Sequence, residues 1–301
     1  MIAGYELTFT NRSLIEAGRA RGELELDTVE NLAALERFVG AIREGIGDHE
    51  HAIEDDGHGF GRHVITELDG NWFKVEIDPW VVEITGKPSN LAFYRAIAPR
   101  MERLFAIASS CDLEPHARIG GGHVHISRTS FESPMAIRNF IVDYANHPEL
   151  ALGIQGHDLL NAPPLAIAPR SSIEAFVEGL ARFDRDQDLE ALFAHLRADV
   201  YTFAGSPELP VHARRAKYQA LCVEHPATIE IRAIRPPRSF AEFIATAELF
   251  ARRIAFLAGR GPIAYRAESW SGAIPPEAFL RDRYETYLAE LDTQASVLCA
   301  P

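Results

Sequence analysis

Five short segments of this chain alternate between apolar and polar residues, and this pattern limits the possible folds more than any other sequence feature. Because a strand sends successive side chains to opposite faces, each segment predicts a strand with one apolar and one polar face. The segments occupy residues 3–10, 73–78, 80–85, 123–127 and 228–232. Helical spacing of apolar residues predicts helices over residues 28–43, 89–108, 134–144, 188–200, 239–257 and 276–291. We therefore expect a sheet whose apolar face is covered by helices.

The polar faces of these segments carry ionisable groups, whereas an ordinary solvated sheet face carries mixed polar residues in no order. The ionisable residues are Glu6, Glu76, Asp78, Glu83, His123, His125, Glu230 and Arg232. Carboxylates packed side by side repel one another strongly unless a cation lies among them. The pattern therefore predicts a divalent metal site on the polar face of the sheet.

The charge balance and the cysteine count argue against several classes of function. The 301 residues include 30 Lys and Arg against 43 Asp and Glu, a net charge of −13, so we expect neither nucleic acid nor an anionic membrane as partner. The three cysteines form no C-x-x-C motif, which argues against a disulfide framework and a thiolate zinc site. The first residues lack the features of a secretion signal, and no apolar stretch approaches the ~20 residues of a membrane span. A cytoplasmic protein is the resulting expectation.

The segment G-G-G-H-V-H-I-S is the most specific motif in the chain. Glycines allow a backbone to approach a ligand closely, and His123 and His125 project from the same face of the predicted strand. The alternative is a glycine-rich turn before a strand with two exposed histidines. An H-x-H strand also occurs in zinc hydrolases, so the motif alone does not choose a chemistry.

Three further segments have both a functional and a plain interpretation. Glu230 and Arg232 could hold a metal and a phosphate side by side, or form a surface ion pair. The basic cluster at residues 214–217 could bind a polyphosphate or belong to a solvated loop. Residues 47–63 hold four of the twelve histidines, and we interpret them as a mobile surface loop rather than a metal site.

Four motifs in this order resemble the amidoligase family of ATP-dependent carboxylate–amine ligases, which are relatives of glutamine synthetase and glutamate–cysteine ligase. G-Y-E-L-T-F resembles the opening G-x-E-x-E motif of the family, and V-V-E-I-T-G-K-P resembles its second acidic strand. G-G-G-H-V-H-I-S is similar to its Gly-His-x-His strand, and K-Y-Q-A-L followed by T-I-E-I-R-A-I-R-P-P is similar to its final Glu-x-Arg strand. The resemblance covers roughly Gly4 to Arg235. It departs at Thr8, where the family has a second acidic residue and a hydroxyl is a weaker magnesium ligand.

The resemblance implies one catalytic domain over residues 1–301, with a helical C-terminal portion from about residue 239. It implies an α+β fold like the catalytic domain of glutamine synthetase, with a curved, mostly antiparallel sheet and helices on its convex face. It also implies that ATP and Mg²⁺, or Mn²⁺ in its place, lie along the concave face. The resemblance further implies that Glu6, His123 and Glu230 hold the ion at the nucleotide phosphates. Glu76 and Glu83 would hold a second ion near the acceptor.

The remaining site assignments follow from the same resemblance. Arg232 stabilises the transferring phosphoryl group and, with Glu83 and Glu230, makes up the expected catalytic set. The residues expected to bind the nucleotide are Lys74, Ser127, Arg214, Arg215 and Lys217, and those expected to contact substrate are Gly121, Gly122 and His125.

The expected reaction joins a small-molecule or peptide carboxylate to an amine through an acyl phosphate. Three alternatives stay open: a phosphotransferase of the same fold that acts on a guanidino or amino group, a zinc-dependent hydrolase, and an inactive binding module. Homo-oligomerisation is also left open.

Overall fold

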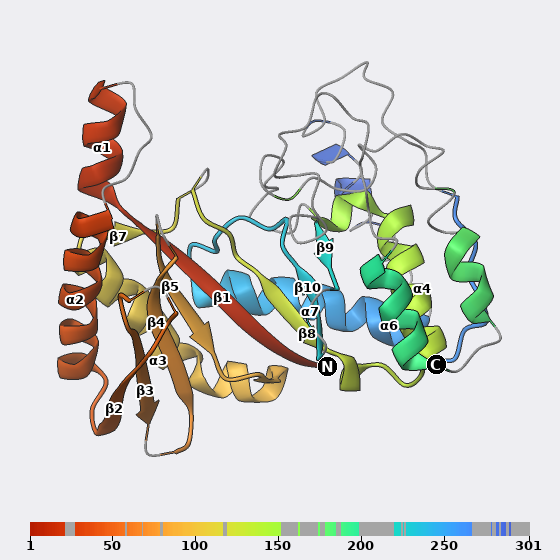
Figure 1. The fold of residues 1–301 in the computed structure, drawn as a ribbon, viewed down its shortest axis with the longest axis horizontal. Coiled ribbons are helices and arrows are strands. Elements are labelled where there is room, and N and C mark those ends of the chain that lie inside the picture. The colour runs from red at the N-terminus through yellow and green to blue at the C-terminus, as the bar shows by residue number, and fades with distance from the viewer. Residues whose placement is uncertain are drawn as a thin grey trace. The chain divides into compact units, whose positions relative to one another are not determined.

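The computed structural model of the chain falls into two compact units (Figure 1). The first unit comprises residues 2–125 and 235–248, and the second comprises residue 1, residues 126–234 and residues 249–301. The structure describes residues 1–21, 28–57, 59–67, 69–78, 81–116, 119–151, 162, 174, 178–184, 188–198, 220–223, 225, 227–266, 278, 281–282, 284–286 and 289. Strand β8 (Val124–Ser127) and helix α7 (Phe240–Leu257) each run from one unit into the other.

The first unit is built on an antiparallel sheet in which β1 is the longest strand (Figure 1). From the outer edge, its strands are β2 (His49–Glu54), β3 (Arg62–Glu67), β4 (Trp72–Asp78), β5 (Val81–Gly86) and β1 (Ile2–Asn11), and each is antiparallel to the next. Two short strands, β6 (Ser89–Asn90) and β7 (Leu113–Glu114), also pair with β1. This arrangement places the polar residues of β4, β5 and β1 on one continuous face, because directly opposed residues share a face.

Helices α2 (Thr28–Gly45) and α3 (Leu91–Ser110) pack on this sheet, and α1 (Arg12–Arg21) follows β1 directly. The apolar residues of β1, which are Ala3, Tyr5, Leu7 and Phe9, are all buried. The Tyr5 ring meets Phe240 and Phe243 of α7 in edge-to-face contacts. Full burial of such a phenylalanine contributes roughly 1.5–3 kcal/mol.

The second unit continues from β8 and holds the strand order β8, β10 (Thr228–Ile231), β9 (Leu221–Cys222). Its helices are α4 (Pro134–Asn146), α6 (Leu189–Ala198) and the second half of α7, with short 3₁₀ turns η1 (Arg128–Ser130), η2 (Pro148–Ala151) and η4 (Ala181–Asp184). Helix α4 begins as its sequence predicts, with the Ser133 side chain accepting the N–H of Ala136.

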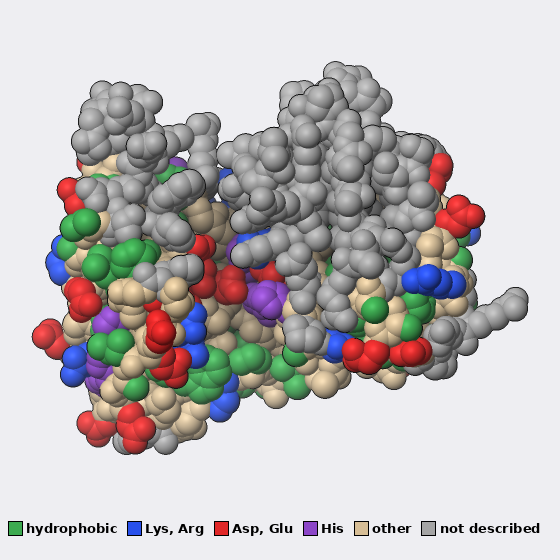
Figure 2. All heavy atoms as spheres, in the orientation of Figure 1, with side chains coloured by type: hydrophobic (Ala, Val, Ile, Leu, Met, Phe, Trp, Pro, Cys, Tyr) green, Lys and Arg blue, Asp and Glu red, His purple; other side chains and the backbone are tan. Residues whose placement is uncertain are grey.

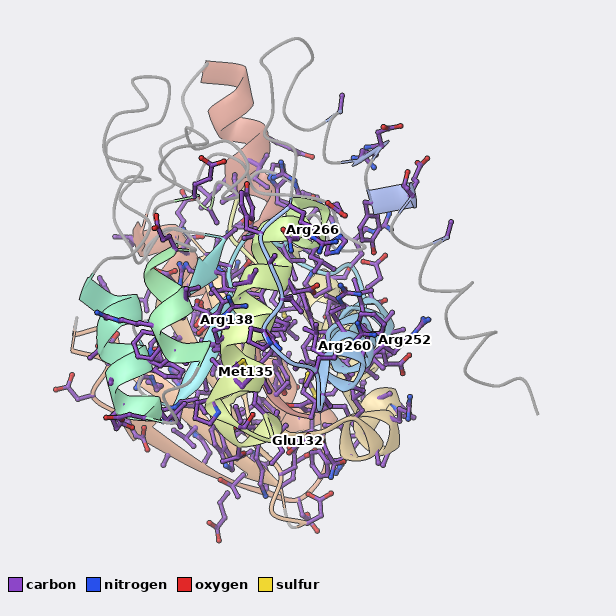
Figure 3. All side chains as sticks on the ribbon, turned by 90° about the vertical axis from the view of Figure 1, so that its right-hand side faces the viewer. Glu132, Met135, Arg138, Arg252, Arg260 and Arg266 are labelled. Atoms are coloured by element: carbon purple, nitrogen blue, oxygen red, sulfur yellow. The ribbon has the colours of Figure 1, made fainter. Side chains whose placement is uncertain are left out.

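Polar side chains of α4 form hydrogen bonds with the backbone of residues 260–266 (Figure 3). The Asn139 side chain donates to the carbonyl of Gly261 at 3.0 Å and accepts the N–H of Ile263 at 3.2 Å. Arg138 donates to the carbonyl of Ile263 at 2.5 Å. Both side chains are buried, so these hydrogen bonds replace bonds to water that the polar groups lose on folding.

The fold is α+β with a mostly antiparallel, open sheet, as the sequence predicts at this level. The predicted helices at 28–43, 89–108, 134–144 and 239–257 are confirmed, with α3 starting two residues later behind its cap Asn90. The helix predicted at 188–200 is present as α6. The predicted strands are confirmed over the described residues. The single catalytic domain stays a prediction.

The expectation of a mobile loop over residues 47–63 is wrong, because β2 and β3 form a hairpin there. Six residue pairs join the two strands, from His49 opposite Glu67 to Glu54 opposite Arg62. An exposed edge strand needs no apolar face, so β2 carries almost no alternation of apolar and polar residues. Most of residues 153–171, 202–217 and 276–291 lie outside the described residues. Across the described ranges, no helix is both long and apolar enough to span a membrane.

Candidate metal-binding site

Glu6 lies on the polar face of β1 between two imidazoles of the Gly-Gly-Gly-His-Val-His segment. The N–H of Glu6 donates to the carbonyl of His123 at 3.1 Å, which aligns the two segments. His125 Nε2 lies 2.7 Å from Glu6 Oε1, and His123 Nδ1 contacts Glu6 Oε2. Burial alone would raise the pKa of Glu6, but attraction to His123 and hydrogen bonds from both imidazoles hold it well below its usual range. Glu6 is therefore a carboxylate at neutral pH, next to two nitrogen donors.

A row of acidic residues crosses the same face. Glu76 on β4 stands directly opposite Glu83 on β5, and Glu83 stands opposite Thr8 on β1. Burial raises the pKa of Glu83 well above its ordinary value, and repulsion from Glu6, Asp78 and Glu76 raises it further. Like charges directly opposite one another destabilise a sheet, so a bound cation would relieve this face.

Basic side chains reach the same face from its outer strands. Arg62 on β3 donates from Nε to Glu76 Oε2 at 2.7 Å. Lys74, predicted to bind a nucleotide, pairs with Glu54 at 3.0 Å and lies over the Trp72 ring. On the surface that Figure 2 shows, acidic, basic and histidine side chains are intermixed over this unit. Among the described residues, neither Arg62 nor Lys74 forms a hydrogen bond or an ion pair with Glu83. The pKa of Glu83 therefore stays raised.

Thr8 connects the strand to the glycine segment instead of serving as a second acidic residue. Its hydroxyl donates to the carbonyl of Gly121 at 2.9 Å, and the side chain is buried. Gly120 has a φ of +78°, and an added Cβ there would lie 2.3 Å from the Thr8 hydroxyl. Both the backbone angle and the space therefore require glycine at position 120.

Close packing leaves no room for a side chain at Gly121 or Gly122. A Cβ on Gly121 would lie 2.5 Å from His123 Nε2, and a Cβ on Gly122 would lie 2.6 Å from the carbonyl oxygen of Arg235. Gly121 therefore leaves space for the His123 ring, and Gly122 allows the close approach of the Arg235 backbone. Their predicted contact with a substrate stays a prediction.

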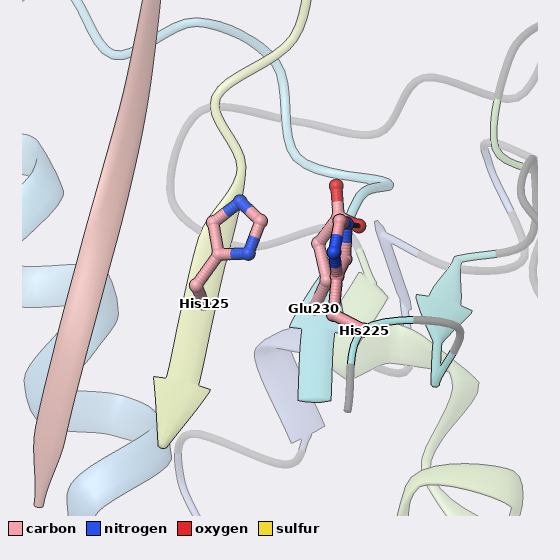
Figure 4. Close-up of side chains that lie close together, drawn as sticks. All are labelled: His125, His225 and Glu230. Atoms are coloured by element: carbon pink, nitrogen blue, oxygen red, sulfur yellow. Dashed lines mark ion pairs between the residues drawn. The ribbon is translucent and has the colours of Figure 1, made fainter. Parts of the chain in front are cut away.

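The second unit holds the Glu-x-Arg motif on β10. Glu230 is buried, its Oε1 contacts the Arg232 guanidinium, and its Oε2 lies 3.4 Å from His225 Nε2 (Figure 4). The alternative of a surface ion pair is wrong for Glu230, since its side chain is 1% exposed. Cys222 on β9 stands directly opposite Glu230.

The sequence did not point to His225 or Arg62 as parts of the polar clusters. His225 lies between β9 and β10. Arg62 lies at the start of β3, within the residues that the sequence pattern suggests are a loop. A histidine in C-V-E-H-P, a few residues before a motif glutamate, was the only available signal.

The Ser127 hydroxyl accepts the N–H of Thr129 at 3.3 Å and caps η1, so its nucleotide role stays a prediction. The predicted nucleotide-binding residues Arg214, Arg215 and Lys217 lie outside the described residues. The structure thus gathers Glu6, His123 and His125 in the first unit, and Glu230 and Arg232 in the second.

A search of protein-family models finds no match to this chain, and a search of curated proteins finds no match either.

Proposed function

We propose that this protein is an ATP- and Mg²⁺-dependent carboxylate–amine ligase with a fold like the catalytic domain of glutamine synthetase. The observation that carries the proposal is Glu6, held between His123 and His125 on a sheet face that also bears Glu76 and Glu83. The order of the four motifs along the chain supports the same assignment.

The donor groups fit a divalent cation. Carboxylate oxygens suit Mg²⁺ and Mn²⁺, and imidazole nitrogens suit ions such as Zn²⁺. A bound cation would also offset the repulsion that helps to raise the pKa of Glu83. When bound, the ion and ATP supply charge neutralisation and the phosphoryl donor.

The proposed reaction follows from the chemistry of a carboxylate, which is a poor electrophile because it is already anionic. Transfer of the γ-phosphoryl group of ATP to the carboxylate would make an acyl phosphate and release ADP. The amine would then attack the carbonyl carbon and lose a proton to solvent, and phosphate would leave as the amide forms. In this proposal Glu6, His123 and Glu230 hold the ion at the nucleotide phosphates, while Glu76 and Glu83 serve the acceptor side. The contact with Glu230 fixes the direction of the Arg232 guanidinium, which stabilises the charge on the transferring group.

An ATP-turnover screen across amino acids and amines with Mg²⁺ tests the proposal. We expect ADP release that depends on a carboxylate acceptor, with amide and free phosphate as products. Glu230→Gln and His123→Ala should each lower turnover by roughly a hundredfold or more, because each removes charge stabilisation. Glu149→Gln and His49→Ala are matched controls outside the proposed site and should retain turnover. Unchanged turnover in both site variants would contradict the assignment.

The same assay separates the competing functions. A zinc-dependent hydrolase is the second candidate, favoured by the two imidazoles that contact Glu6. It would need no ATP and would lose activity to a chelator that removes zinc but spares magnesium. A phosphotransferase would leave a phosphorylated product, and an inactive binding module would give no turnover.

A further inference from the structure

We propose that Arg62 holds a carboxylate of the acceptor substrate, so that the acceptor carries a second carboxylate besides the one that reacts. The inference deepens the proposed function, on which it rests for placing the acceptor at the Glu76 and Glu83 side of the sheet face. It names a substrate-binding residue that the four motifs of the resemblance do not include.

Arg62 belongs to a row of side chains that crosses the polar face of the first unit. On β3 it stands opposite Glu54 of the edge strand β2, and its side chain contacts Glu76 of β4. Glu76 is opposite Glu83 of β5, and Glu83 is opposite Thr8 of β1. Because directly opposed residues share a face, Arg62 lies on the same surface as the proposed acceptor side.

A hydrogen bond fixes the direction of the Arg62 guanidinium and leaves its terminal nitrogens available. The bond runs from Nε to Glu76 Oε2 at 2.7 Å. Among the residues that the structure describes, the terminal nitrogens of Arg62 form no hydrogen bond. A guanidinium in this state presents a planar fork of N–H donors, which matches a carboxylate through two parallel hydrogen bonds.

The exposure of Arg62 also suits a ligand site better than a surface ion pair. Its side chain is 30% exposed and that of Glu76 is 16% exposed, so solvent reaches the fork while the aiming contact is partly shielded. Partial shielding from water strengthens hydrogen bonds to charged groups. Arg95 on α3 shows the contrast, because it is 60% exposed and binds Glu248 through a terminal nitrogen as well as Nε.

The charges of this face explain why an anionic acceptor needs Arg62. The glutamates of the row repel a carboxylate, and Lys74 is already paired with Glu54 at 3.0 Å. Strand β3 lies three strand spacings from β1, or about 14 Å across β4 and β5. Arg62 can thus attract one end of an acceptor while the other end reacts nearer to β1, where the proposed ion neutralises it.

Titration calorimetry of dicarboxylates into the full-length protein tests the inference, with Mg²⁺ present and nucleotide absent. The probes are succinate, glutarate and adipate, and each is compared with its monoamide, in which a neutral group of similar shape replaces one carboxylate. We expect the unaltered chain to bind at least one of these diacids at least tenfold more tightly than its monoamide. Arg62→Gln should abolish this preference, and Arg62→Lys should keep only part of it because an ammonium lacks the planar fork.

Arg95→Gln is the matched control, since it removes a guanidinium that is paired with a glutamate on a helix instead of on the sheet face. It should keep the full preference for the diacid. Circular dichroism identifies a misfolded variant, and Arg62→Lys decides the result if Arg62→Gln fails to fold. A separate titration of ATP shows whether either Arg62 variant weakens nucleotide binding instead.

The inference is overturned if the unaltered chain prefers none of the diacids to its monoamide, or if both Arg62 variants keep the preference. A loss of ATP affinity with an unchanged diacid affinity would assign the fork to the nucleotide and overturn it too. The ligase proposal fails separately, since Arg62-dependent diacid binding without ATP turnover would contradict the ligase alone. ATP turnover together with a diacid preference that ignores Arg62 would contradict this inference alone.

Discussion

At the scale of single residues, the polar sheet face combines groups whose protonation is pushed in opposite directions. Two imidazoles lower the pKa of Glu6, whereas burial and three neighbouring carboxylates raise that of Glu83. Glutamates on adjacent strands thus differ because only one of them faces nitrogen donors. Divergent pKa values within one cluster are typical of functional sites.

Replacing Glu83 with glutamine should stabilise the metal-free protein at neutral pH. Because the folded pKa of Glu83 is raised, the stability it contributes is present below its unfolded pKa and is lost as the pH rises through the folded pKa. Glu83→Gln removes this loss, so we expect Tm to rise by roughly 2–4 °C at pH 7.5 and to change little at pH 4. Thermal melts in chelator measure this, and a lower Tm at pH 7.5 would contradict the prediction.

Gly121→Ala should damage the site more than the fold. A Cβ there would lie 2.5 Å from His123 Nε2, so the imidazole has to move away from Glu6. We expect divalent-ion affinity to fall about tenfold, since displacing a ligand by even part of an ångström disrupts binding geometry. Gly40→Ala is the control, because nothing lies within 4 Å of its added Cβ. Equal ion affinity in the two variants would argue against a ligand role for His123.

At the scale of elements, a buried ion pair joins α4 to α7 in the second unit. Arg253 donates to both carboxylate oxygens of Asp143, and both side chains are almost fully buried. Removing one partner leaves the other charge buried without compensation, which typically costs about 3–5 kcal/mol. We expect Arg253→Met to lower the free energy of unfolding by this amount, as measured by urea denaturation. The double variant Asp143→Leu with Arg253→Met should recover most of the loss, and a loss equal to that of Arg253→Met would contradict the account.

Most elements could be predicted from the sequence, because burial on one face leaves a periodic trace. Strand β1 alternates cleanly since helices cover its apolar side, and α3 repeats its buried positions at helical spacing. Strand β2 could not be predicted, because it lies at the sheet edge and both of its faces are largely exposed. Helix α1 was missed for a related reason, since its sequence R-S-L-I-E-A-G-R-A-R is mostly polar.

The site could be predicted only in part. Glu6, Glu83 and His123 could be found because they occur within alternating motifs, and the strand register then brings their faces together. His225 was missed because its contact with Glu230 depends on the shape of a turn, which no periodicity encodes. The packing role of Gly122 was missed because it involves the carbonyl of Arg235, 113 positions further along the chain.

At the scale of the whole molecule, the motifs of the resemblance are divided between the two units. Glu6, Glu83 and His123 belong to the first unit, and Glu230 and Arg232 belong to the second. The ligase proposal requires ligands from both, so it predicts that losing an acidic ligand from either unit impairs binding of the same ion. With a net charge of −13, the protein depends on such local groups rather than on its overall field to bind a nucleotide.

The most direct test of the central claim is a titration of Mn²⁺ into the protein with ATP present, followed by electron paramagnetic resonance of the free ion. The account predicts saturable binding that weakens at least tenfold in Glu6→Gln and in Glu230→Gln. Glu248→Gln, which removes a glutamate of α7 that pairs with Arg95, should bind as the unaltered chain does. Binding that is unchanged in both Glu6→Gln and Glu230→Gln would show that these carboxylates do not hold the ion.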